Sequence, residues 1–169
     1  PGSAQYALEL GKAYLSENTL AMERLPMALK TLETAARLEP FQVATWIWLA
    51  RAQLKTGQLD EAAISVEQVL TLSPENAEAA ILQAEIALLN KSYQAAHEYA
   101  QTAVQARPED PKTTLLLAKT LKSLHRPNEA LEVLESAIPV SQDPFQLQCE
   151  RANLLRELKG PDAALQVLT

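Results

Sequence analysis

Two amphipathic stripes flank Gly57 in residues 43–76. Apolar residues recur at i, i+3 and i+4 before the glycine and at i, i+4, i+7 and i+8 after it, and both spacings place side chains on one face of an α-helix. Gly57 tolerates the positive φ that is needed just past a helix end, and Pro74 cannot continue the second helix. The pattern predicts a helix, a tight turn, a second helix and a terminating turn. The stripes consist of Trp46, Leu49 and Ala50, and of Ala62, Val66, Val69 and Leu70.

The same pattern recurs along the chain at a fixed spacing. Alanine occupies one place in five successive repeats and proline another place in three, always 34 residues apart (62 − 28 and 74 − 40). One helical hairpin cannot bury its apolar face alone, so stacked hairpins must share a core. The predicted fold is an all-α solenoid, a single array of about five helix-turn-helix repeats. The recurrent residues are Ala28, Ala62, Ala96, Ala130 and Ala164, and Pro40, Pro74 and Pro108. The predicted repeats span 4–42, 43–76, 77–110, 111–144 and 145–169, the last of them incomplete or uncapped.

Further small residues stand where helices must meet. In the 34-residue register, position 1 falls at residues 9, 43, 77, 111 and 145, and alanine then fills position 8 in four repeats and position 20 in five. Helix axes approach to about 8–10 Å where the side chains in contact are small. The two positions therefore predict a close antiparallel pair of helices in each repeat. The residues at position 8 are Ala50, Ala84, Ala118 and Ala152.

The repeat resembles the tetratricopeptide-repeat family. The resemblance covers essentially the whole chain and implies a right-handed superhelix whose first helices line a concave groove. It also implies that the groove binds segments of other proteins. The residues that carry it in the best-matched repeat are Trp46, Leu49, Ala50, Gly57, Ala62, Val69 and Pro74.

The first repeat departs from the 34-residue register. Residues 10–14, Leu-Gly-Lys-Ala-Tyr, are similar to the family's first-helix signature but stand five residues too early. This offset indicates an insertion near 18–23 in the first turn, with Pro26 as the start of the next helix. The alternative is a longer second helix that is kinked at Pro26.

The resemblance places repeat positions 2, 5, 9, 12 and 13 on the groove. Ile47, Ile81 and Leu115 at position 5 would form an apolar ladder, and large apolar groups on a solvent-facing groove mark a binding site. The alternative is that position 5 packs against the neighbouring repeat as core. The predicted groove residues are Leu8, Lys12, Ala44, Ile47, Arg51, Leu54, Lys55, Glu78, Ile81, Glu85, Leu88, Lys112, Leu115, Lys119, Lys122, Cys149, Asn153 and Arg156.

One family ligand is disfavoured by the same positions. Some tetratricopeptide repeats grip the C-terminal carboxylate of chaperones with lysine, asparagine and arginine side chains on three groove helices. Here the asparagines are missing, and Glu78 and Glu85 would repel a carboxylate in the middle of the groove.

Charge and composition narrow the function. The formal net charge of −6 works against nucleic-acid binding, which needs clustered lysine and arginine, and so against an RNA-binding helical-repeat array. No apolar run approaches the roughly 20 residues of a membrane span. The single cysteine, Cys149, excludes an internal disulfide and favours a reducing, cytoplasmic compartment.

No constellation for catalysis or cofactor binding is recognisable. The only two histidines, His97 and His125, lack metal-ligand spacing, Cys149 has no histidine near it in the register, and no glycine-rich phosphate loop occurs. We therefore expect no enzyme activity, no metal and no cofactor.

The sequence predicts a protein–protein interaction scaffold that binds a peptide or helix with apolar residues. An alternative is a recruiting or assembly domain of a larger protein, such as a transferase, secretion or complex-assembly factor. In this alternative, apolar residues at the end of the array allow self-association. These residues are Leu165, Val167 and Leu168.

Overall fold

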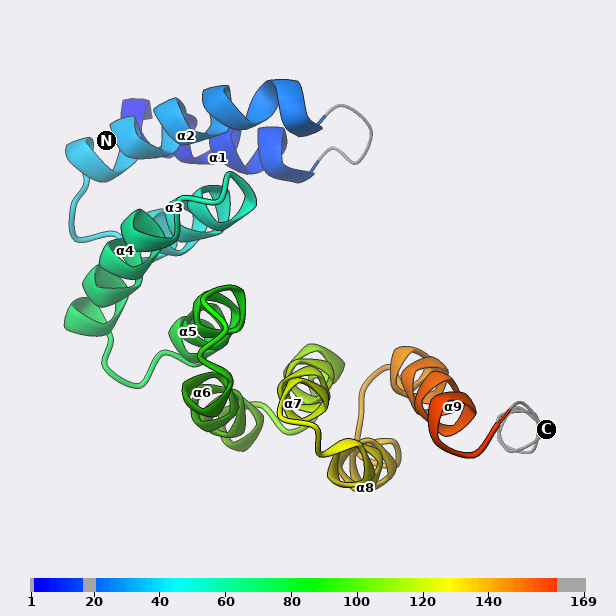
Figure 1. Ribbon diagram of the computed structural model, residues 1–169. Coiled ribbons are helices and arrows are strands. Elements are labelled where there is room, and N and C mark those ends of the chain that lie inside the picture. Colours follow the sequence, from blue (N-terminus) through cyan, green and yellow to red (C-terminus); the bar gives the residue numbers. More distant parts are fainter. Residues whose placement is uncertain (1, 17–20, 161–169) are drawn as a thin grey trace. The chain divides into compact units, whose positions relative to one another are not determined.

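The computed structural model describes residues 2–16 and 21–160. Over these residues the chain forms nine α-helices and no strand (Figure 1). The helices are α1 (Gly2–Ser16), α2 (Ala21–Leu38), α3 (Val43–Lys55), α4 (Leu59–Leu72), α5 (Ala77–Leu89), α6 (Tyr93–Ala106), α7 (Pro111–Ser123), α8 (Pro127–Ala137) and α9 (Phe145–Lys159). The helix-turn-helix pattern predicted for 43–76 is confirmed, and α3, α5, α7 and α9 begin 34 residues apart.

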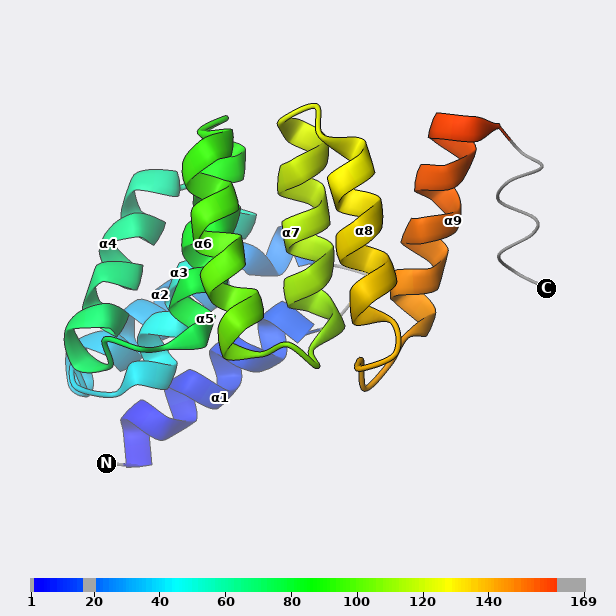
Figure 2. The same cartoon turned by 90° about the horizontal axis from the view of Figure 1, so that it is seen from below.

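The chain consists of two compact units, residues 1–82 and 83–169, and the division falls within α5. In the first unit, α1 packs on α2 and α3, and α3 packs on α2 and α4. In the second unit, α7 packs on α6, α8 and α9, and α8 also packs on α9. Figure 2 shows α7 and α8 side by side as an antiparallel pair. Helices α1 and α7 thus each contact both the second helix of their own hairpin and the first helix of the next hairpin.

Small residues lie at the contacts between paired helices, as predicted. The alanines at position 20, Ala28, Ala62, Ala96 and Ala130, are all completely buried. Those at position 8 are buried as well. Gly11 of α1 is another such contact, because a Cβ placed there would lie 2.5 Å from Cγ of Leu32 in α2. The helices are therefore held closer together than a larger side chain would permit.

The turn between the two helices of a hairpin has the same backbone geometry in three repeats. Gly57 has a φ of 77°, which confirms the left-handed conformation predicted from the glycine. Lys91 and His125, which follow at 34-residue steps, have a φ of 58°. A left-handed conformation is unfavourable for side chains other than glycine, so packing of the flanking helices imposes it there.

Helix α2 differs from the first prediction for its start. It begins at Ala21 and contains Pro26, so the interpretation of Pro26 as the first helical residue is wrong and the alternative of a longer second helix holds. Leu25 explains this, because its side chain is buried in the core of the first unit and the turn before the proline is therefore packed. That burial offsets the backbone hydrogen bond that Pro26 cannot donate.

Several predicted features lie outside the described residues. The inserted segment near 18–23 overlaps residues 17–20, and the last recurrent alanine, Ala164, lies beyond residue 160. The apolar residues of the proposed self-associating end, Leu165, Val167 and Leu168, also lie there.

The alanine contact is tested by the variant Ala62→Leu. We expect it to lower the free energy of unfolding by roughly 1–3 kcal/mol, because the site has no space for a larger side chain. The matched control is Ala63→Leu, which adds the same atoms to a half-buried neighbour on α4. Urea unfolding followed by circular dichroism measures both variants. Equal stability of the two variants would contradict the contact assigned to Ala62.

Candidate functional site

The predicted groove residues lie on the surface with one exception. Leu8 is 2% exposed and belongs to the core of the first unit, so the prediction that it contacts a partner is wrong. The reason is the packing of α1 on both α2 and α3, which leaves no solvent at Leu8. All other predicted groove residues are half-buried or exposed.

In the first unit, the charged groove residues are engaged with one another. Arg51 of α3 forms an ion pair with Glu78 of α5, and its guanidinium lies 4.7 Å from the centre of the Trp48 ring. Lys12 of α1 lies 5.9 Å from the same ring and 2.8 Å from Glu9. An indole ring attracts cations over its face, so Trp48 holds both of them. Arg51 and Lys12 are therefore already engaged with acidic and aromatic side chains.

Apolar side chains are partly open to solvent beside these charges. Ile47 and Leu54 on α3 and Ile81 on α5 are half-buried, and Ala44 is exposed. The exposed Lys55 donates a hydrogen bond of 3.3 Å to the carbonyl oxygen of Leu15, near the end of α1. This bond satisfies a carbonyl that a helix end leaves without an intrahelical donor.

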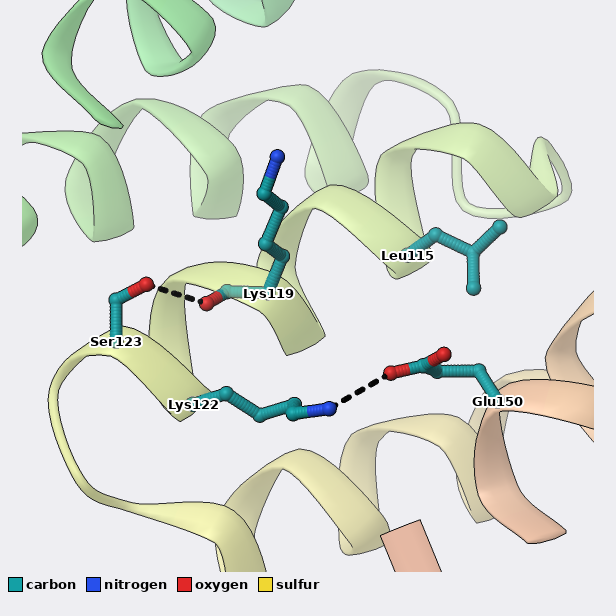
Figure 3. Close-up of a pocket in the computed structure, with 5 residues that line it drawn as sticks. All are labelled: Leu115, Lys119, Lys122, Ser123 and Glu150. Atoms are coloured by element: carbon teal, nitrogen blue, oxygen red, sulfur yellow. Dashed lines mark hydrogen bonds and ion pairs between the residues drawn. The ribbon is translucent and has the colours of Figure 1, made fainter. Parts of the chain in front are cut away.

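In the second unit, a cavity of about 540 Å³ opens between α7 and α9. Leu115, Lys119 and Lys122 follow at spacings of four and three residues on one face of α7. Ser123 completes the α7 side, and Glu150 of α9 lines the opposite side (Figure 3). The structure thus brings three predicted groove residues together in one pocket.

Lys122 is bound by two acidic residues of α9. Its Nζ lies 3.2 Å from Glu150 and 3.5 Å from Glu157. Burial lowers the pKa of Lys122, but the hydrogen bond and charge of Glu150, assisted by Glu157, outweigh it and leave the pKa above its ordinary value. Lys119 extends away from this ion pair in Figure 3 and is exposed.

The remaining predicted residues of the second unit do not line this pocket. Leu88 and Cys149 are half-buried. The others, Glu85, Lys112, Asn153 and Arg156, are exposed.

Three residues of these surfaces were not predicted. Ser123 and Glu150 line the pocket, and Trp48 carries two cations on its ring. A signal for Glu150 exists in the sequence, because it follows Lys122 by 28 residues, close to the 27-residue spacing of Arg51 and Glu78. A signal for Ser123 exists too, because it stands at position 13 of its repeat, one of the positions that the resemblance places on the groove.

His97 lies in the core of the second unit. It is 8% exposed, and its Nδ1 has no hydrogen-bond partner among the described residues. Burial lowers the pKa of His97, the charge of Arg126 lowers it further, and Glu129 and Glu98 oppose the change. Over the described ranges no group of three or more potential ligand side chains could hold a metal ion. None of the described helices is both long and apolar enough to cross a membrane.

Two family models match the chain. One, described as tetratricopeptide repeat, matches residues 19–86. The other, described as anaphase-promoting complex, cyclosome, subunit 3, matches residues 55–137. Among curated protein sequences, none matches this chain.

Solved structures of helical-repeat proteins resemble the chain over nearly its full length. A thermophilic tetratricopeptide-repeat protein of Thermus thermophilus is 20% identical, with a TM-score of 0.78, over 97% of this chain and 87% of that one. PilF of Pseudomonas aeruginosa is 19% identical, with a TM-score of 0.79, over 98% and 73%. MamA (41-end) of Desulfovibrio magneticus RS-1 is 17% identical, with a TM-score of 0.75, over 99% and 92%. These likenesses confirm the predicted all-α helical-repeat solenoid.

The buried histidine predicts a pH dependence of stability. The folded pKa of His97 lies below the ordinary value of 6.5, so the unfolded chain binds more protons as the pH falls through about that value. We therefore expect the free energy of unfolding to decrease between about pH 7.5 and pH 5.5, and His97→Leu to reduce this decrease. The measurement is urea unfolding at both pH values.

The control for this prediction is His125→Asn. It removes the other histidine, which is exposed, and asparagine tolerates the left-handed backbone at that position. This variant should keep the pH dependence of the unmodified protein. Identical pH dependences for His97→Leu and the unmodified protein would contradict the assignment to His97.

Proposed function

This chain belongs to the tetratricopeptide-repeat family, and on that premise we propose that it binds a segment of a partner protein along the first helices of its hairpins. Tetratricopeptide repeats mediate protein–protein interaction. The proposed ligand is a peptide or a helix with apolar residues, and the proposed role is that of a scaffold without catalysis. We also propose that residues 1–169 form one array with repeats beginning at 43, 77, 111 and 145, supported by the matching helix starts.

The observation that carries the proposal is the row of aliphatic side chains at position 5. Ile47, Ile81 and Leu115 stand one repeat apart on α3, α5 and α7, and all three remain half-buried. By contrast, the alanines at position 8 of the same helices are buried. Helices α3, α5 and α7 therefore bury small residues and keep a large aliphatic one partly accessible to a ligand. Covering that apolar surface on binding stabilises a complex by about 25 cal/mol per Å² removed from water.

The charges beside the aliphatic row favour a protein ligand. In the first unit, Arg51 is paired with Glu78 and stacked on Trp48, so it is not available to bind phosphates along a nucleic acid. In the second unit, Lys122 is paired with Glu150 and Glu157. Nucleic-acid affinity depends on several free lysine or arginine side chains. Apolar contacts with a few polar groups around them are typical of peptide recognition in grooves.

The triple variant Ile47→Ser, Ile81→Ser, Leu115→Ser tests this function. Short peptides are selected from a random displayed library for binding to the unmodified protein, and their affinities are measured by fluorescence anisotropy. We expect the triple variant to bind them at least about tenfold more weakly, because three apolar contacts are removed. Its helix content, measured by circular dichroism, should stay close to that of the unmodified protein.

A matched control replaces three aliphatic residues outside the proposed groove, in the variant Leu38→Ser, Ile64→Ser, Val140→Ser. All three side chains are exposed, on or after second helices. This variant should keep full affinity. If it loses affinity as much as the groove variant, the effect is a general loss of surface apolarity and the proposal fails. Unfolding of the groove variant would show that position 5 is core.

A further inference from the structure

Residues 27 apart on successive first helices have opposite charges in two cases, but not in the case of Lys119. Arg51 at position 9 pairs with Glu78 at position 2 of the next repeat, 27 residues later. The same spacing relates Glu85 to Lys112, which are again opposite in charge. At the next step it relates Lys119 to Gln146, a neutral amide. The sequence therefore omits the acidic residue at the position that would face Lys119.

Lys119 has no acidic partner within the described part of the chain. The neighbouring Lys122 is bound to Glu150 and Glu157, whereas Lys119 points away from that pair (Figure 3). The Ser123 hydroxyl donates to the carbonyl oxygen of Lys119 at 3.0 Å, so its proton is already used. Lys119 is thus the cation in this pocket that remains available to an anionic ligand.

An apolar side chain lies next to this free cation. Leu115 precedes Lys119 by one helical turn on the same face of α7, and both line the cavity of about 540 Å³. A volume in the range of about 300–1,000 Å³ suits a small ligand or a few side chains of a peptide. The charged residues of α7 are all lysines, Lys112, Lys119 and Lys122, although the chain as a whole carries a net charge of −6. Of the charged residues that line the pocket, Lys119 and Lys122 are cations and Glu150 is an anion bound to Lys122, so Lys119 is a cation beside an apolar side chain with no bound acid among the described residues.

We propose that the pocket between α7 and α9 binds a peptide segment in which an aliphatic residue is next to an aspartate or glutamate. The aliphatic side chain contacts Leu115, and the carboxylate pairs with Lys119. Glu150 and Glu157 are both bound to Lys122, so neither of them occupies Lys119. This inference rests on the proposed function and specifies the ligand chemistry of one pocket.

The test uses peptides selected from a random displayed library and synthesised with amidated C-termini, so that only side-chain carboxylates can act. We expect acidic residues to be enriched next to aliphatic ones. Lys119→Gln should weaken binding about three- to tenfold, the range for a charge-assisted contact in a partly open pocket. Gln146→Glu should weaken binding similarly, because it supplies the acid that the register lacks.

Two controls isolate the charge effect. Lys159→Gln removes a lysine of α9 that does not line the pocket, and Gln101→Glu adds an acid on the exposed face of α6. Both should leave affinity within about twofold, since exposed charges outside the contact interact weakly. Raising the salt concentration should weaken binding to the unmodified protein more than binding to Lys119→Gln.

A double-mutant cycle gives the decisive readout. Each peptide is compared with a version in which its acidic residue is replaced by the amide, on both the unmodified protein and Lys119→Gln. A clear coupling between the two changes supports the pocket contact. Peptides without acidic enrichment, or a coupling of zero, overturn this inference. The proposed function is tested separately, and a loss of binding in the triple serine variant would still support it. If no peptide is selected at all, both proposals fail.

Discussion

The contact between the two helices of each hairpin has space for a methyl group and little more. Ala28, Ala62, Ala96 and Ala130 are all without solvent exposure, and Gly11 meets the side chain of Leu32. Because these contacts are so close, the larger apolar residues of each helix must project elsewhere. Leu8 and Leu15 belong to a core shared by neighbouring hairpins of the first unit, whereas Ile47 remains partly open to solvent. The narrow contact therefore decides both how hairpins stack and which side chains are left for a ligand.

A second consequence concerns the first helices of successive hairpins. Since α1 packs on α3 and α7 packs on α9, residues on neighbouring first helices come within reach of one another. Arg51 reaches Glu78, and Lys122 reaches Glu150 and Glu157, with spacings of 27, 28 and 35 residues. Such partly exposed pairs add little to stability, typically about 0–1 kcal/mol. Their larger effect is on specificity, because they determine which charges remain for a partner.

The two units differ in whether the cations beside their aliphatic side chains are paired. In the first, both cations near the aliphatic row are engaged, Arg51 with Glu78 and Trp48, and Lys12 with Trp48 and Glu9. In the second, Lys119 stands beside Leu115, and no acid among the described residues pairs with it. An unpaired charge on a binding surface attracts partners of opposite charge, which raises the association rate and favours those partners over others. Each unit thus offers apolar contact to a ligand, and the second adds a cation that can select for an acidic one.

The amino-acid sequence by itself determined the repeat. Alanine and proline at 34-residue intervals, with helical spacing between them, specify the helix starts at 43, 77, 111 and 145 and the left-handed turn at Gly57. These features depend on residues close together in the chain, where spacing and backbone preference act directly. The resemblance assigned position 5 to the groove, and Ile47, Ile81 and Leu115 are half-buried there, whereas Leu8 is buried.

Tertiary structure decided the rest, because contacts between helices outweigh local preference. Packing buries Leu8 against α2 and α3 and keeps Pro26 inside α2, although proline alone indicates a helix start. The same packing imposes left-handed backbone on Lys91, where no glycine signals it. The pocket required the approach of α9 to α7, which brings Glu150 to Lys122 and leaves Lys119 free of an acid among the described residues. The pairing of Lys122 and the lack of an acid at Lys119 in the described part of the chain could not be predicted from one helix, since both depend on the distance between two helices.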